Sequence, residues 1–133
     1  MTLVDSAVWI GWLRNERSAQ TARLEALLDD GAAAICPVIL QELLQGTTSQ
    51  VNLQTVQARF SRLPMLMPGD ALRLHVEAGS LYARARWSGI TARSPHDCLI
   101  AVTALLADVP LLHDDRDFER LAEVEPGLVL MRG

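Results

Sequence analysis

The chain has 133 residues, half of them hydrophobic, which is long enough for one domain with a buried core and too apolar for a disordered segment. Its net charge of -4 gives it no general affinity for nucleic acid, although two bound Mg²⁺ ions would cancel that charge. All twelve basic residues are arginine, which excludes mechanisms that need a lysine, such as that of the phosphate-loop nucleotide hydrolases.

The apolar pattern and the turn residues predict strands that alternate with helices. A short strand at residues 2–4 leads to Asp5, and a helix at residues 6–13 carries Trp9 and Trp12 on one face. The other predicted helices are 18–29, 38–44 after Pro37, about 51–63, about 71–87 capped by Asp70, and 95–107 opened by Ser94; the other predicted strands are 32–36, 65–67, 111–112 and 128–131. This alternation predicts an α/β fold with a mainly parallel sheet, in a single domain spanning residues 1–133.

Neither a membrane segment nor a disulfide framework is expected. No apolar run reaches membrane-spanning length, and no basic residue precedes Asp5 as it would in a signal peptide. We therefore expect a cytoplasmic protein that does not insert into a membrane. Cys36 and Cys98 lack the spacing of a zinc site and are too few for a disulfide framework, so they are predicted to be buried free thiols.

Four acidic residues fall where the predicted strands end or where helices begin near the same edge. Asp5 follows the first strand, and Asp115 lies just past the strand at residues 111–112. Glu42 and Asp97 lie in helices that start close to that edge. Because ligands bind beyond the carboxyl ends of the strands in open parallel sheets, these side chains are expected to converge there.

Such a convergence predicts a site for a hard divalent cation. Two carboxylates about 4 Å apart repel by about 4 kcal/mol at an effective dielectric constant near 20. A cation removes this cost, and ligands that are all oxygen favour Mg²⁺, or Mn²⁺ in its place, over zinc. A metal held in this way can orient a water and stabilise a leaving oxygen, so phosphodiester hydrolysis is the natural chemistry.

Each acid also has a structural explanation when it is taken singly. An Asp after a strand is often a helix cap, and an Asp in the first turn of a helix often only complements the helix dipole. Asp114 and Asp117 compete with Asp115 for the fourth position, and Asp117 is also a candidate accessory ligand. The joint placement of the acids at one predicted sheet edge favours a site over these separate roles.

Several further residues are candidates for contacts with substrate phosphate. Ser6 could donate a hydrogen bond to phosphate or simply cap its helix. The arginine candidates, chosen because guanidinium binds phosphate in a bidentate manner, are Arg84, Arg86, Arg93 and Arg116. Each arginine taken alone is more often an ordinary surface charge, while Trp9 and Trp12 better fit a core or a partner-binding face.

The segments around the acids resemble the motifs of PIN-domain ribonucleases, and more closely those of the VapC toxins of type II toxin-antitoxin systems. In order, the segments are VDSAVWI at residues 4–10, LQELL at 40–44, DCLIA at 97–101 and HDDRDF at 113–118. By this resemblance Asp5, Glu42, Asp97 and Asp115 are the metal-binding catalytic acids, and Asp117 assists them. One departure is His113, where many PIN domains have Ser or Thr.

The resemblance implies a PIN-like three-layer sandwich and Mg²⁺-dependent endonucleolytic cleavage of RNA by attack of water. It also implies inhibition by a cognate VapB-like antitoxin, a homodimer, and a heterotetramer or larger assembly with the antitoxin. A groove around Trp9, Trp12 and Leu43 is the expected antitoxin site. The alternative is a PIN-like module that binds metal or partners without catalysis, while a receiver-type phosphoacceptor is disfavoured because the chain has no lysine.

Overall fold

A small parallel sheet organises the fold in the computed structural model, which describes residues 1–133. Its strands are β1 (Thr2–Val4), β2 (Ala33–Ala34), β3 (Leu111–Leu112) and β4 (Leu130–Met131), in the spatial order β2-β1-β3-β4. Every pairing is parallel, and Leu3 of β1 lies opposite Ala34 on one side and Leu111 on the other. The carboxyl ends of the strands therefore share one edge, as the α/β prediction required.

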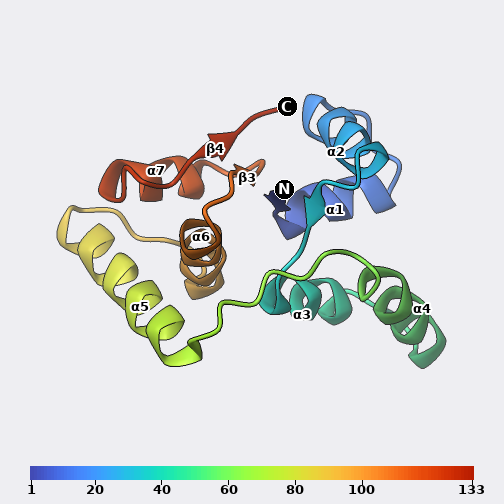
Figure 1. Ribbon diagram of the computed structural model, residues 1–133, viewed down its shortest axis with the longest axis horizontal. Coiled ribbons are helices and arrows are strands. Elements are labelled where there is room, and N and C mark those ends of the chain that lie inside the picture. Colours follow the sequence, from blue (N-terminus) through green and yellow to red (C-terminus); the bar gives the residue numbers. More distant parts are fainter.

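Helices cover both sides of this sheet. They are α1 (Ser6–Leu13), α2 (Ala19–Asp29), α3 (Pro37–Gln45), α4 (Gln50–Phe60), α5 (Ala71–Trp87), α6 (Pro95–Ala107) and α7 (Arg116–Val124). Figure 1 shows α1 to α4 grouped on one side of the strands and α5 to α7 on the other, with α5 packed along α6. None of the helices combines the length and the apolar character that crossing a membrane requires.

Helix starts follow the capping signals in the sequence. The side chains of Ser18, Asp70 and Ser94 each accept a hydrogen bond from a backbone N–H in the first turn of α2, α5 and α6. Pro37 occupies the first turn of α3, where its missing N–H costs no helical hydrogen bond. These predicted helix starts are confirmed to within a residue.

Trp9 anchors α1 to the sheet and to α4. Its indole N–H donates to the carbonyl of Val4 at 3.0 Å, and its ring meets that of Phe60 edge to face at a centroid distance of 5.2 Å. Trp12 adds a second edge-to-face contact at 5.8 Å, and the guanidinium of Arg59 lies 4.7 Å from the centre of its ring. The shared face predicted for the two tryptophans is thus part of the core at Trp9 and half-exposed at Trp12.

The predicted strand at residues 65–67 is wrong. The backbone here forms only one parallel bridge, between Ile35 and Met65, with Ile35 N–H donating to Pro64 and Leu66 N–H donating to Ile35. Pro64 and Pro68 have no N–H to extend a ladder, so pairing stops after one residue. Strands β2 and β4 and helix α4 are likewise shorter than predicted, and α4 ends at Phe60 in a tight turn ahead of Pro64.

Helix α7 is absent from the helices predicted from the sequence. Asp115 is the N-cap of this helix and accepts from the N–H of Asp117 at 2.9 Å. Phe118 and Leu121 are fully buried on one face of it. The signal was present as an Asp cap followed by apolar residues three apart, but the density of charges in the segment obscured it.

Both cysteines are buried free thiols, as predicted. Burial raises the pKa of Cys36 and of Cys98 to about 11. The thiols are therefore neutral at physiological pH and poor nucleophiles, since reactivity belongs to the thiolate. They act as small packing residues of the core.

Candidate active site

Four of the predicted acids come together because each sits at a fixed point of the fold. Asp5 directly follows β1 and is the N-cap residue of α1, and its backbone N–H donates to the carbonyl of Leu112 at 3.0 Å. Asp115 follows β3 and caps α7. Asp97 lies in the first turn of α6, and Glu42 lies within α3. The carboxyl edge of the sheet thus gathers side chains from four helices.

The tightest group contains Asp97, Asp115 and Asp117, whose carboxylates each offer an oxygen within 4.8 Å of the other two. Asp5, at the start of α1, and Glu42, in α3, complete the group. They lie close enough that the charge of Asp97 raises the pKa of Asp5, and the charge of Glu42 raises the pKa of both Asp5 and Asp97. Asp5, Asp97 and Asp117 are 5%, 9% and 2% exposed. We call these five residues the acid cluster.

Burial and mutual repulsion leave two members of the acid cluster only partly ionised at neutral pH. Removal from water, followed by the negative charges of Asp97 and Glu42, raises the pKa of Asp5 to about 7, against the pull of the N–H groups of Ser6 and Ala7. Burial, followed by repulsion from Asp115, Glu42 and Asp117, raises the pKa of Asp97 to about 7. A divalent cation among the carboxylates would reverse both effects.

Glu42 is held from two directions. The hydroxyl of Ser6 donates to its Oε1 at 3.2 Å, and Nδ1 of His96 lies 3.6 Å from its Oε2. Ser6, a candidate for phosphate binding, therefore uses its hydroxyl on a neighbouring acid in this structure. His96, which directly precedes Asp97 in α6, likewise helps to orient Glu42.

Asp117 differs from the other acids because cations surround it. Its Oδ2 accepts from the backbone N–H of Arg93 at 3.2 Å and lies 3.8 Å from the guanidinium Nε of the same residue. Nη1 of Arg120, one turn further along α7, lies 3.6 Å from its Oδ1. Arg120 was missed by the sequence reasoning because its role depends on α7, which was not predicted.

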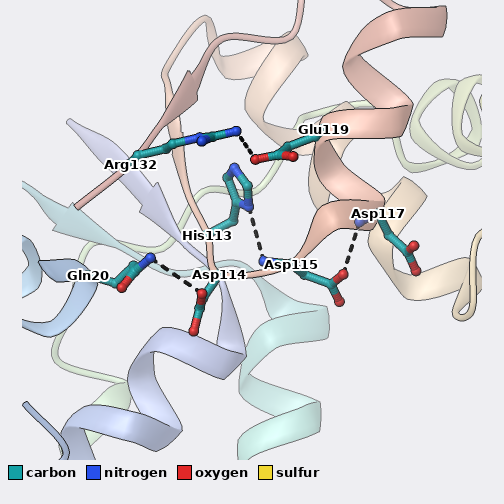
Figure 2. Close-up of polar contacts among 7 residues, drawn as sticks. All are labelled: Gln20, His113, Asp114, Asp115, Asp117, Glu119 and Arg132. Carbon is teal, nitrogen blue, oxygen red and sulfur yellow. Dashed lines mark hydrogen bonds and ion pairs between the residues drawn. The ribbon is translucent and has the colours of Figure 1, made fainter. Parts of the chain in front are cut away.

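Of the arginines proposed to bind phosphate, most lie away from the acid cluster, and so does Asp114. Arg93 is the one predicted arginine with an ion pair to the acid cluster, and its side chain is 79% exposed. Arg84 donates to Ser80 on its own helix, and Arg86 and Arg116 are exposed. Asp114 is exposed as well and accepts a hydrogen bond from Gln20 (Figure 2), as expected of a turn residue.

His113 fixes the turn that carries Asp115. Its ring is 3% exposed, packs against Phe118, and accepts the N–H of Asp115 on Nδ1 at 3.2 Å (Figure 2). Burial lowers its pKa, so the ring is neutral, and the hydrogen bond places its proton on Nε2. Nε2 has no hydrogen-bond partner in the protein. The imidazole thus accepts a hydrogen bond from the backbone N–H two residues further along the chain, that of Asp115. Asn, Ser and Thr side chains can accept the same hydrogen bond.

Comparison with known proteins agrees with this architecture. Residues 2–124 match the family model of the PIN domain. The chain belongs to the PIN-domain family. The PIN domain is 33% identical over 126 residues to "VapC ribonuclease Mb1587" of Mycobacterium bovis and to "Ribonuclease VapC11" of Mycobacterium tuberculosis, with 93% of this chain and 93% of each relative covered. This PIN domain therefore belongs with the VapC ribonucleases.

Solved structures support the fold of the PIN domain independently of sequence. A chain of VapBC2 from Rickettsia felis, bound to a promoter DNA fragment, superposes with a TM-score of 0.76 at 20% identity, covering 99% of this chain and 98% of that one. A chain of DNA-bound VapBC from Salmonella typhimurium gives a TM-score of 0.75 at 24% identity, covering 98% of this chain and 96% of that one. The predicted α/β sandwich with a parallel sheet is confirmed.

The raised pKa values predict how the stability of the metal-free PIN domain depends on pH. Unfolded aspartates titrate near pH 3.9, whereas Asp5 and Asp97 do so at about 7 in the folded state. Between these values the folded state binds more protons, so its free energy of unfolding should fall as pH rises from 5 to 8. Urea denaturation with a chelator present measures this. Asp97→Asn should flatten the dependence and Asp114→Asn should preserve it, whereas higher wild-type stability at pH 8 would contradict the placement of the acids.

The acceptor on His113 predicts different outcomes for two substitutions of equal size. His113→Leu leaves the N–H of Asp115 without an acceptor, at a cost of roughly 1 to 3 kcal/mol, whereas His113→Asn can accept the same hydrogen bond. Neither variant keeps the ring that packs against Phe118. We therefore expect the Asn variant to be more stable than the Leu variant in urea denaturation. Identical behaviour of the pair would show that the hydrogen bond does not position Asp115.

Proposed function

We propose that this PIN domain is a Mg²⁺-dependent endoribonuclease toxin of a type II toxin-antitoxin system, acting in the cytoplasm. The observation that carries the proposal is the group of buried carboxylates at the sheet edge, with the pKa of Asp5 and of Asp97 raised to about 7. Such a group is stable and fully ionised only around a cation. The names of the relatives, which are VapC ribonucleases, point to RNA as the substrate.

The donor set fits Mg²⁺, with Mn²⁺ as a substitute. Asp5, Glu42, Asp97 and Asp115 offer only carboxylate oxygens, which suit a hard cation and disfavour zinc. When bound, the cation supplies positive charge that promotes ionisation of a water and stabilises the leaving oxygen. Asp117 is assigned an accessory role, because its charge is already compensated by Arg93 and Arg120.

The reaction that these residues support is hydrolysis of a phosphodiester bond. The oxygen of a water molecule bonds to phosphorus as the bond from phosphorus to the leaving oxygen breaks, and the proton of the water passes to a carboxylate of the acid cluster or to solvent. A proton from solvent completes the leaving hydroxyl. Ser6 and His96 keep Glu42 oriented throughout, since both contact its carboxylate.

Arg93 is the proposed contact for the substrate phosphate nearest the acids. Its exposed guanidinium already lies at the border of the acid cluster, so it can bind a phosphate oxygen without a large rearrangement. The proposed contacts for phosphates further along the RNA are Arg84, Arg86 and Arg116. Ser6 is left out of this set, because its hydroxyl already donates to Glu42. Arginines placed along the bound RNA would supply local positive charge there, although the protein as a whole has a net charge of -4.

The proposed protein partner is a VapB-like antitoxin, as in the VapBC complexes named above. A hollow of about 770 Å³ lined by Trp12, Arg17 and Arg59 lies where α1, α2 and α4 meet. Of the three residues expected to line the antitoxin groove, Trp9 and Leu43 are buried in the core. We therefore place the antitoxin at the hollow that contains Trp12. Exposed Leu72 and Val76, near the start of α5, offer an apolar surface for a homodimer and larger assemblies with antitoxin.

Removing one metal-binding acid should abolish RNA cleavage. We expect Asp97→Asn and Glu42→Gln to lower kcat by about a hundredfold or more, the scale on which removal of one electrostatic stabiliser lowers enzymatic rates. Asp114→Asn is the matched control, because it neutralises an exposed acid outside the acid cluster and should leave the rate near that of the wild type. Cleavage of a labelled single-stranded RNA by antitoxin-free protein measures all three, and full activity in Asp97→Asn would refute the assignment.

Divalent cations should stabilise the folded protein. Mg²⁺ at a hundredfold excess over its dissociation constant should add about 2.7 kcal/mol to the free energy of unfolding if one ion binds only the native state. Thermal unfolding with and without Mg²⁺ or Mn²⁺ measures the shift. Asp97→Asn should reduce the shift, and the absence of any shift in the wild type at saturating metal would count against a preformed site.

A further inference from the structure

A second hollow lies directly beside the acid cluster and takes no part in the chemistry described so far. Its volume is about 330 Å³, at the lower end of the range for sites that bind small organic groups. Helices α3, α5 and α6 and the segment before α5 contribute its walls. Those used in the argument are Val38, Gln41, Met67, His75, His96 and Leu99. We call this space the side pocket.

The side pocket and the acid cluster share a wall. His96 lines the pocket, and Nδ1 of the same ring lies 3.6 Å from the carboxylate of Glu42. Gln41, which also lines the pocket, precedes Glu42 in α3. When a phosphate of an RNA strand lies at the acid cluster, the base of the neighbouring nucleotide is therefore within reach of the side pocket.

The lining suits a flat ring with polar edges. Val38, Met67 and Leu99 provide apolar surface, and His75 and His96 provide rings on which a base can stack. Gln41 adds an amide that can both donate and accept. Nδ1 of His75 lies 2.7 Å from the carbonyl of Ala71 and donates to it, which leaves Nε2 free to bond to an occupant of the pocket. No charged side chain lines the pocket, which disfavours a phosphate or a carboxylate as its occupant.

We propose that the side pocket binds one base of the RNA substrate, that of a nucleotide flanking the cleaved phosphate. It thereby contributes to the choice of cleavage sequence. A neighbouring hollow of about 320 Å³ shares His75 and Leu99 and extends past Tyr82 and Pro95, so the path for the RNA strand continues along α5 and α6. This inference rests on the proposed ribonuclease function and adds a binding role for residues outside the acid cluster.

The three histidines of the chain allow a binding test that does not depend on cleavage. Their imidazole NMR signals are followed while a short single-stranded RNA is added to protein that holds Ca²⁺ in place of Mg²⁺. His75 and His96 should shift with RNA, while buried His113 should stay in place as an internal reference. If the His75 signal shifts with protein concentration but not with RNA, a second copy of the chain covers the pocket and the inference fails.

Cleavage of RNAs that differ at only one base beside the cut tests the consequence for sequence choice. The wild type should prefer one base at that position, and His75→Ala and Gln41→Ala should each reduce the preference ratio in kcat/KM at least fivefold. Gln54→Ala, on the exposed face of α4 and outside the pocket, is the control and should retain the ratio. Cleavage by wild-type protein with a ratio unchanged in both pocket variants overturns the inference while leaving the ribonuclease function intact. Absence of wild-type cleavage would instead refute the proposed function.

Discussion

Repulsion between carboxylates in a nearly dry site is the constraint on which the rest of this structure depends. The parallel sheet has its carboxyl ends at one edge, and Asp5 and Asp115 follow two of its adjacent strands. The helices that cover the sheet add Glu42 and Asp97 to the same point. Each close pair costs about 4 kcal/mol at an effective dielectric constant of about 20, so the fold must offset this repulsion before it can be stable.

The acids are compensated in three different ways, and the differences indicate where a cation is needed. Asp117 has Arg93 and Arg120, and Glu42 has a hydroxyl donor and an imidazole. Asp5 and Asp97 have no arginine partner, and without metal their repulsion is relieved by taking up protons, as a pKa of about 7 for each implies. The uncompensated charge thus lies between α1 and α6, which is where a bound cation would stabilise the protein most.

Much of this organisation could be predicted from the sequence, because it follows from local rules. Strand β1 is a short apolar run that ends at an acid, and capping residues mark the starts of α2, α5 and α6. The convergence of Asp5, Glu42, Asp97 and Asp115 then follows from the topology of a parallel sheet. What could not be predicted depends on tertiary contacts. The compensation of Asp117 requires α7 and the loop of Arg93 to meet, and the partner of the His113 ring could not be named until the ring was placed. The strand expected at residues 65–67 failed for the opposite reason, since its apolar residues suggested pairing that its flanking prolines prevent.

The proximity of the acid cluster and the side pocket follows from the geometry of two helices. Successive residues of an α-helix point about 100° apart, because a turn contains 3.6 residues. In α3, Gln41 lines the side pocket and Glu42 belongs to the acid cluster; in α6, His96 lines the pocket and Asp97 belongs to the cluster. A change in the tilt or rotation of either helix would therefore move an acid and a pocket wall together. If the proposed base recognition holds, sequence preference can be altered at Gln41 and His96 themselves, whereas repacking α3 or α6 beneath them would displace the acids at the same time.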